Sequence, residues 1–375
     1  MPPRHFIAIL LVGMLSIACH VQSRRVDAGL LVGEAVQLIE QFYVEPVQRD
    51  KLVGAAMKGL TTSLDENSGY IAGEAFSGFQ ETINQEFAGI GIFVEPSEDG
   101  PVRVITPLVG SPALEAGLMP NDLIVQIDGD DSSQWDLQRV SQRLRGPVGT
   151  SVSLVLRRGD DQVSTEVQRK TIKMESVIGD HRDNQNRWVY RLADAPEIAY
   201  LRMTSFGEKT VQELRDQLIA LDNDFDALVL DLRSNPGGLL NAGVSVCDMF
   251  LESGEIVSTR IRDGQLEDEW KATAGVLVDS EKPVAVLIDD NSASASEIVA
   301  GCLQDHGRAT IVGIRSFGKG TVQNIFPMQY GRSALRLTVA RYYRPSGKNI
   351  HRTADAKPED DWGVLPDAGM EVELD

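Results

Sequence analysis

The sequence contains a run of five apolar residues, Val284-Ala285-Val286-Leu287-Ile288, and soon after it a serine-rich segment, Asn291-Ser292-Ala293-Ser294-Ala295-Ser296-Glu297-Ile298. A short continuous apolar run is typical of a strand buried on both faces, as in a parallel sheet covered by helices. From Ala295 to Gln304 the apolar residues recur at helical spacing. The stretch therefore predicts a strand, a tight turn that carries the serines, and a helix.

The same alternation of strand and helix continues on both sides of this stretch. Further strands are predicted at 198–203, 227–230, 309–312 and 335–342, and further helices at 211–221 and 240–250. Strands that alternate with helices form a largely parallel sheet. We therefore expect an α/β core over residues 172–375.

Two regions with other patterns precede this core. Residues 88–171 contain short β-type runs at 102–105, 123–127 and 152–156, separated by Gly, Pro and Asp turns, with one helical stretch at 136–144. This pattern predicts a small β-rich domain inserted before the core. Residues 27–87 have helical spacing, so an N-terminal helical region is expected there.

Residues 1–22 resemble an export leader. A basic start at residues 4–5 precedes an apolar stretch over residues 6–18, which is shorter than the ~20 residues of a membrane span but suits a signal-peptide core. Leu15-Ser16-Ile17-Ala18-Cys19 is similar to a lipoprotein cleavage box, although Ser16 departs from it. We expect an exported protein of the periplasm or cell envelope. Plain cleavage, lipid attachment at Cys19 and an uncleaved anchor stay open.

The composition excludes several function classes. The 375 residues carry a formal net charge of −19, and 42% of them are apolar, enough for a sizeable core. No Lys/Arg-rich run is present, so nucleic-acid binding is not expected. After Cys19 only Cys247 and Cys302 remain, without a Cys/His cluster, so we expect no metal and no cofactor. Both lie in helical patterns typical of buried thiols, and a disulfide between them is left open.

Ser294 lies where the predicted turn meets the predicted helix. A nucleophile on such a turn is exposed at the carboxyl edge of the sheet. The helix N-terminus also favours the negative charge that develops on an attacked carbonyl. Helix capping is the alternative, because Ser and Asn are preferred caps.

Lys319 lies in a second segment, Ser316-Phe317-Gly318-Lys319-Gly320-Thr321-Val322-Gln323. A lysine acts as a base only when it is neutral, so burial must lower its pKa from about 10.4 to roughly 7–8. Flanking glycines let the backbone pack closely, and Gln323, four residues on, shares a face with the lysine and is expected to hold its amine. A solvated loop lysine is the alternative. A phosphate-binding loop is rejected, because Gly320 stands where Ser or Thr is needed.

A third segment, Asp231-Leu232-Arg233-Ser234-Asn235-Pro236-Gly237-Gly238, also follows a predicted buried strand. Paired glycines can turn backbone N–H groups toward a ligand, which makes an oxyanion hole plausible, with the Ala295 N–H as second donor. A plain turn is the alternative. The histidines outside the leader lie in no motif with a carboxylate, so a Ser-His-Asp triad is unsupported.

With these three segments in this order, the chain resembles the carboxyl-terminal processing peptidases, or tail-specific proteases, of serine peptidase family S41. Phe317 to Gln323 matches the family's lysine motif, and Ser294 is the middle serine of its Ser-Ala-Ser-Ala-Ser-Glu motif. The resemblance implies a crotonase/ClpP-like α/β core and a serine endopeptidase that needs no cofactor. The implied site consists of the nucleophile Ser294, the base Lys319, the lysine-orienting Gln323, and the oxyanion donors Gly238 and Ala295.

Residues 88–171 resemble the PDZ domain of the same family. Ala88-Gly89-Ile90-Gly91-Ile92 is similar to its carboxylate-binding strand, which implies that Gly89, Ile90, Gly91 and Ile92 hold a substrate tail beside the helix at 136–144. Ile90 and Ile92 as plain core residues are the alternative. The implied partners are proteins or peptides with exposed C-termini. A homo-oligomer and membrane attachment through the N-terminus stay open.

Two other functions compete with this interpretation. A catalytically inactive PDZ scaffold would bind protein C-termini without cutting them, but all three catalytic segments are intact. An acyl-CoA enzyme of the crotonase type would share the fold of the core, but it leaves the PDZ-like region unexplained.

Overall fold

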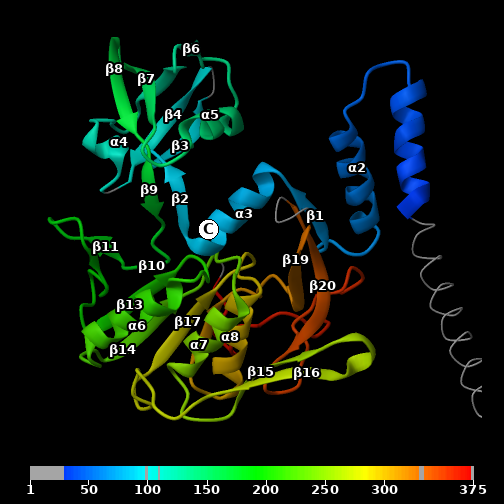
Figure 1. Cartoon of the computed structure of the whole chain (residues 1–375). Coiled ribbons are helices and arrows are strands. Elements are labelled where there is room, and N and C mark those ends of the chain that lie inside the picture. The colour runs from blue at the N-terminus through cyan, green and yellow to red at the C-terminus, as the bar shows by residue number, and fades with distance from the viewer. Residues whose placement is uncertain (1–28, 98–99, 109, 329–332, 373–375) are drawn as a thin grey trace, which may run out of the picture. The chain divides into compact units, whose positions relative to one another are not determined.

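The computed structural model describes residues 29–97, 100–108, 110–328 and 333–372 (Figure 1). The leader predicted at residues 1–22, with Cys19, lies outside these ranges. The described residues form two compact units. The first comprises those within 1–76 and 323–338, and the second those within 77–322 and 339–375. Within the described ranges, no helix is both long and apolar enough to cross a membrane.

A five-stranded sheet with the order β10-β13-β14-β17-β18 forms the centre of the second unit. β13, β14, β17 and β18 are parallel, and β10 pairs antiparallel at one edge. The predicted parallel sheet is confirmed, and β13 and β17 have the predicted bounds. The strands are β10 (Val177–Ile178), β13 (Ile198–Met203), β14 (Ala227–Asp231), β17 (Val284–Ile288) and β18 (Thr310–Gly313).

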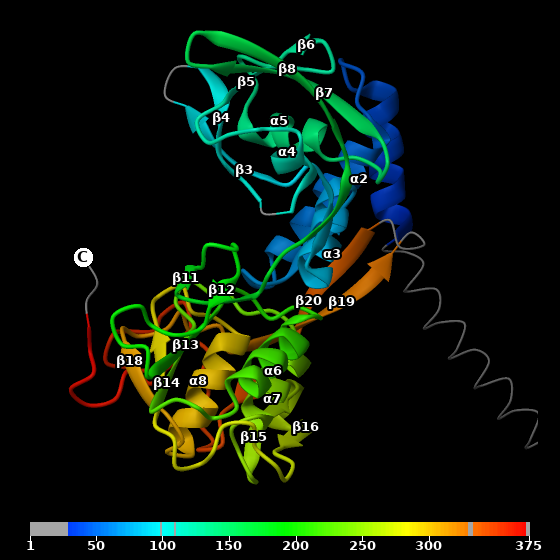
Figure 2. The same cartoon turned by 90° about the vertical axis from the view of Figure 1, so that its left-hand side faces the viewer.

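Three helices pack next to this sheet: α6 (Thr210–Leu221), α7 (Leu240–Asp248) and α8 (Ala295–Asp305) (Figures 1 and 2). α7 and α8 approach closely, because a Cβ added to Gly243 would lie 3.3 Å from the Ala295 Cβ. Cys247 on α7 and Cys302 on α8 are fully buried free thiols that contact each other. Their burial agrees with the helical patterns seen in the sequence.

A second group of strands in this unit is antiparallel. β15 (Glu255–Arg260) pairs with β16 (Leu266–Lys271) across the short helix η1 (Arg262–Gly264), and the end of β20 (Ser333–Tyr343) pairs with β15. A small hairpin is formed by β11 (His181–Arg182) and β12 (Trp188–Val189).

The β-rich domain has its own sheet, in the order β3-β4-β5-β7-β8, and its own apolar core. The predicted strands and helix are all present, and the Asp136 side chain caps the helix by accepting from the Arg139 N–H at 2.7 Å. The elements are β3 (Ile92–Ser97), β4 (Gly100–Pro107), α4 (Pro112–Glu115), β5 (Leu123–Ile127), β6 (Asp130–Asp131), α5 (Leu137–Leu144), β7 (Ser151–Arg158) and β8 (Asp161–Gln168).

Residues 88–92 do not form one strand. β2 (Glu86–Gly89) pairs with β9 (Lys170–Lys173) and ends before Ile90, and β3 begins only at Ile92. The chain turns at Gly91, whose φ is 76°. A Cβ added to this glycine would lie 2.5 Å from the Ser111 Cβ. The segment expected to form one carboxylate-binding strand is therefore interrupted at Ile90 and Gly91, and the turn there needs a glycine.

In the first unit, residues 29–42 and α2 (Arg49–Thr62) are helical, as expected. The N-terminal region also contains a strand that the sequence did not predict, β1 (Gly69–Ala72), which pairs antiparallel with the first part of β20. β19 (Thr321–Met328) also pairs with β20. α3 (Glu74–Asn84) follows β1, and its residues from 77 onward belong to the second unit.

Candidate active site

Ser294 stands between β17 and α8, at the N-cap position of the helix. Its backbone has φ 56° and ψ −113°, a conformation that residues with a Cβ rarely adopt. The residue is only 7% exposed. Strained backbone of this kind persists where its surroundings hold it, and it clusters at functional sites. This backbone distinguishes Ser294 from an ordinary extended helix cap.

The serine-rich turn is held by the loop that follows β14. The Ala293 N–H and the Ser296 hydroxyl both donate to the backbone oxygen of Asn235, at 3.0 and 2.9 Å. The Ser292 hydroxyl donates to the backbone oxygen of Leu232 at 2.8 Å. Because β14 and β17 are parallel neighbours, the loops after them meet at one edge of the sheet.

Glu297, in the first turn of α8, is fully buried. Its carboxylate accepts hydrogen bonds from the Ser294 N–H at 2.8 Å, the Ser316 hydroxyl at 2.6 Å, the Gly318 N–H at 2.7 Å and the Lys319 N–H at 2.8 Å. Burial raises the pKa of this carboxyl above its usual range, although the four donors oppose the shift. One carboxylate thus joins the backbone of the candidate nucleophile to that of the candidate base.

Lys319 is half-buried, and the glycines beside it are packed against the chain near residues 351–352. A Cβ added to Gly318, which has φ 90°, would lie 2.6 Å from the Arg352 Cβ. A Cβ on Gly320 would lie 2.1 Å from the backbone nitrogen of His351. The backbone therefore packs closely around both glycines, as predicted from the sequence.

The glycine pair after β14 packs against the nucleophile turn. A Cβ on Gly237 would lie 2.6 Å from the Ala293 oxygen and 2.9 Å from the Ala295 nitrogen. The Gly237 N–H is already used, because it donates to the Asn235 side chain at 2.9 Å. Within the described ranges, neither the Gly238 N–H nor the Ala295 N–H donates a hydrogen bond. These two N–H groups are the oxyanion donors implied by the family resemblance.

Asp231, the last residue of β14, is fully buried and fixes the chain as it enters this loop. Its carboxylate accepts from the Tyr200 hydroxyl at 2.7 Å and from the Arg233 guanidinium at 2.6 and 2.9 Å. Burial alone would raise the pKa of Asp231, but the hydrogen bonds from Arg233 and Tyr200 favour the ionised form more strongly. The pKa therefore lies below its usual range.

Replacing Asp231 by asparagine should lower the free energy of unfolding by about 3 kcal/mol at neutral pH, because Arg233 loses its ionised partner in a buried site. A lowered carboxyl pKa stabilises the fold above the unfolded pKa, about 3.9, and that contribution is lost as the pH falls through the folded pKa. The deficit should therefore shrink below about pH 4. Urea unfolding of Asp231→Asn checks this against Asp194→Asn, a change at an exposed loop position. Equal stability of the two variants at neutral pH would contradict it.

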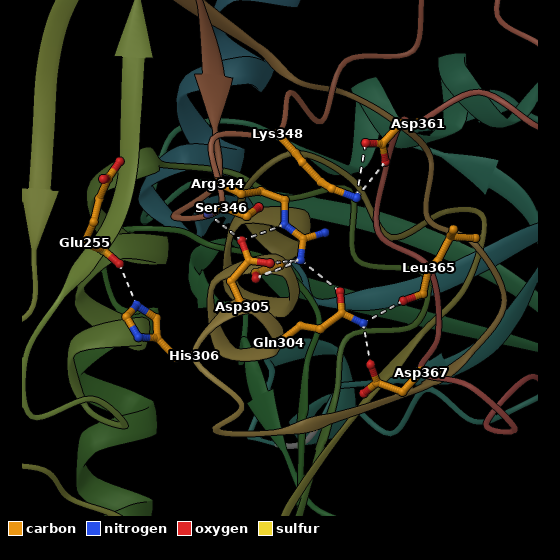
Figure 3. Close-up of polar contacts among 11 residues, drawn as sticks. Glu255, Gln304, Asp305, His306, Arg344, Ser346, Lys348, Asp361, Leu365 and Asp367 are labelled. Atoms are coloured by element: carbon orange, nitrogen blue, oxygen red, sulfur yellow. Dashed lines mark hydrogen bonds and ion pairs between the residues drawn. The ribbon is translucent and has the colours of Figure 1, made fainter.

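The far end of α8 is held by a buried arginine (Figure 3). The Arg344 guanidinium pairs with Asp305 and donates to the Gln304 side chain at 2.9 Å. A Cβ on Gly301 would lie 3.0 Å from the Arg344 Nε, so the glycine leaves room for the guanidinium. α8 is thus tied to the rest of its unit at both ends.

Gln323 lies in the first unit, on β19, with its side-chain amide 3.4 Å from the Thr338 hydroxyl. Lys319 belongs to the second unit. The predicted contact between Gln323 and Lys319 would join the two units, and it stays a prediction.

A pocket of about 300 Å³ lies on the β-rich domain beside α5. Ile90 belongs mainly to the domain core, at 2% exposed, whereas Ile92 is half-buried. The pocket coincides with the groove expected from the sequence, and tail binding in it stays a prediction. Its lining includes Gly89, Ile90, Gly91 and Ile92 from the predicted segment, Ser141 and Leu144 from α5, and Gly78 and Glu81 from α3.

The sequence pattern assigns no role to Glu297 or Asp231, although both lie inside the quoted segments. Their importance depends on burial and on hydrogen-bond donors that the fold brings to them.

The described part of the chain contains no cluster of His, Cys, Asp or Glu suited to a metal ion.

Residues 197–369 match the family model of peptidase family S41, and residues 103–158 match that of a PDZ domain. The chain is 39% identical to a carboxy-terminal-processing protease of Bartonella bacilliformis, over 91% of this chain and 75% of that protein. It is 33% identical to a carboxyl-terminal-processing protease of Synechocystis, over 90% of this chain and 75% of that protein.

Among solved structures, a photosystem II D1 C-terminal processing protease matches with 27% identity and a TM-score of 0.51, covering 92% of each chain. A putative S41 protease from Bacteroides fragilis matches with 18% identity and a TM-score of 0.53, covering 88% of each chain. At that identity the second match supports the fold alone.

Proposed function

Because the chain belongs to peptidase family S41 and is a carboxy-terminal-processing serine protease with a PDZ domain, we propose that Ser294 and Lys319 form its catalytic dyad. The observation that carries this assignment is the single buried carboxylate of Glu297, which accepts from the backbone N–H of both residues. A nucleophile and a base must keep a fixed relation to each other, and a shared hydrogen-bond acceptor supplies one.

The proposed reaction is acyl transfer to Ser294. Neutral Lys319 takes the serine proton as Oγ attacks a peptide carbonyl, and the carbonyl electron pair moves onto its oxygen. The N–H groups of Gly238 and Ala295 then stabilise the oxyanion. The amine leaves with a proton from Lys319, and the lysine afterwards activates the water that hydrolyses the acyl-enzyme. Gln323 is proposed to orient the lysine amine.

We further propose that the pocket beside α5 takes the C-terminal tail of a protein substrate. Loop N–H groups would hold the terminal carboxylate, and apolar tail side chains would fill the pocket.

The leader-like sequence at residues 1–22 supports export to the periplasm or cell envelope. The mass of the mature N-terminus tests this, since an intact Met1 in cell-envelope material would contradict leader removal.

An unfolded protein with an apolar C-terminal tail should be cut at internal peptide bonds, and amidation of its terminal carboxylate should lower kcat/KM by about 10-fold. The loss follows from hydrogen bonds to a charged group, worth about 1.5–3 kcal/mol. Mass spectrometry of the products locates the cuts, and initial rates compare the two forms. Equal rates would contradict tail recognition through the carboxylate, and an uncut acid form would contradict the proposed endopeptidase activity.

A further inference from the structure

Asn235 is fully buried in the loop that follows β14. Its side-chain oxygen Oδ1 accepts from the Gly237 N–H at 2.9 Å, and its Nδ2 donates to the backbone oxygen of Met203 at 2.8 Å. One partner is a donor and the other an acceptor, so together they fix which way the amide faces. Because Met203 ends β13, the side chain ties the glycine pair to the end of a neighbouring strand.

The backbone of the same residue holds the nucleophile turn. As described above, the Asn235 oxygen accepts from the Ala293 N–H and from the Ser296 hydroxyl, the residues two positions apart on either side of Ala295 and Ser294. Asn235 therefore contacts the nucleophile turn through its backbone and the glycine pair through its side chain. The relative position of these two turns depends on one buried residue.

The peptide group between Gly237 and Gly238 is held from its other side by Phe206. The Gly237 oxygen accepts from the Phe206 N–H at 3.0 Å, and the Leu239 N–H donates to the Phe206 oxygen at 2.7 Å. In a planar trans peptide the C=O and the N–H point in opposite directions. The Gly238 N–H therefore points away from the Phe206 N–H. Its direction is set once the Gly237 oxygen is held.

Two consecutive N–H groups thus lie beside the nucleophile turn, and only one of them is engaged. A glycine pair has wide backbone freedom, so its peptide groups rotate easily unless hydrogen bonds hold them. An oxyanion is stabilised only by donors that are in place before the charge develops. The acceptor that Asn235 supplies to the Gly237 N–H removes this freedom on one side, and the Phe206 N–H removes it on the other.

We propose that Asn235 is a positioning residue for the oxyanion hole. Its Oδ1 holds the Gly237 N–H, so that the Gly238 N–H is presented to the attacked carbonyl next to the Ala295 N–H. Asn235 acts through the glycine pair and not on the reacting atoms. The inference rests on the proposed acyl transfer to Ser294.

Asn235→Ala and Asn235→Ser test the proposal as a pair, because they differ by one oxygen atom. A serine hydroxyl can accept from the N–H two residues on, in a weaker form of the same turn, whereas alanine cannot. Both variants lose the contact with Met203. Asn223→Ala is the matched control, since the Asn223 side chain also donates to a backbone oxygen, that of Leu277 at 3.3 Å, and accepts from a backbone N–H, that of Asp279 at 3.1 Å.

The measurements are kcat, KM and the inhibition constant of a peptide aldehyde that carries the sequence of a cleaved substrate. The aldehyde adds to the Ser294 hydroxyl, and the hemiacetal oxygen then occupies the oxyanion hole, so its inhibition constant reports on that hole directly. Rates are expressed per active site titrated with a fluorophosphonate. Circular dichroism melting establishes that each variant is folded.

For Asn235→Ala we expect kcat to fall about 100-fold and aldehyde binding to weaken by a similar factor, the effect of losing one oxyanion donor, with KM unchanged. Asn235→Ser should recover about 10-fold of both losses, because its hydroxyl restores an acceptor. Asn223→Ala should lose stability but keep kcat and aldehyde binding within about 2-fold of wild type.

Wild-type kcat in Asn235→Ala would overturn the proposal, and so would a fall in kcat without weaker aldehyde binding or equal losses in the alanine and serine variants. If Asn235→Ala does not fold, Asn235→Ser decides against the control, and wild-type values for it would overturn the proposal. If Ser294→Ala is inactive while both Asn235 variants work like wild type, only this inference fails. Activity of Ser294→Ala would instead overturn the dyad.

Discussion

Ser294→Ala should cut a protein substrate with an apolar tail at least about 10⁴-fold more slowly than wild type. The cleavage rate of Lys319→Met should fall by about the same factor. Without Oγ no acyl-enzyme can form, and without the amine no group is proposed to accept the serine proton. Because the two residues act as one unit, the double variant should be no slower than either single variant. The oxyanion N–H groups survive these substitutions, so a small residual rate is expected.

The measurement is the initial rate of cleavage of an unfolded protein with an apolar tail, with products identified by mass. Ser253→Ala and Lys271→Met are matched controls, because both side chains are exposed, the first after α7 and the second on β16. Both controls should cut at the wild-type rate. Additive losses in the double variant would contradict a dyad, even if each single variant is slow.

Glu297→Gln should lower kcat by about 100-fold or more, with a small change in KM. The amide keeps the size of the carboxylate, but one oxygen becomes an NH₂ group. That donor must then face N–H donors at 2.7–2.8 Å, from Gly318 or from Ser294 and Lys319. A buried donor left without an acceptor costs about 1–3 kcal/mol, and displacing both members of the dyad adds a further loss.

Stability should respond to this substitution in a different way from activity. A carboxyl whose pKa is raised in the folded state stabilises the fold below its unfolded pKa, and this contribution is lost as the pH rises through the folded pKa. The ionised form therefore costs stability at neutral pH, and the neutral amide removes that cost, which offsets the penalty of its unpaired NH₂ donor. The main effect should thus appear in kcat rather than in the unfolding midpoint.

Glu213→Gln supplies the matched control. Glu213 also lies in the first turn of a helix, α6, and its carboxylate accepts from the Ser176 N–H at 2.8 Å and from the Ser176 hydroxyl at 2.7 Å. Because it contacts neither member of the dyad among its described partners, its variant should keep the wild-type kcat. If Glu297→Gln kept kcat as well, the shared acceptor would have no part in catalysis.

The elements that carry the site could be predicted because their signals are local. The apolar run of β17 and the helical spacing of α8 each specify their own structure, and both were located within one residue. β1 could not be predicted in this way. It pairs with residues 333–336 of β20, more than 250 positions away, and that partner overrides the helical pattern of its neighbours.

The site residues that belong to a sequence motif could be predicted. Residues whose role depends on contacts with distant segments could not. Ser294 and Lys319 follow from the motifs. Glu297 stands in the same motif, but its role depends on donors from residues 316–319, which only the fold brings together.

The most direct test of the dyad is the rate at which a fluorophosphonate forms its adduct in wild type and in Lys319→Met, with the modified peptide identified by mass. We expect one adduct, on Ser294, and a rate at least about 100-fold lower once the amine is gone. An adduct on another residue, or an equal rate in both proteins, would show that Ser294 is not activated by Lys319.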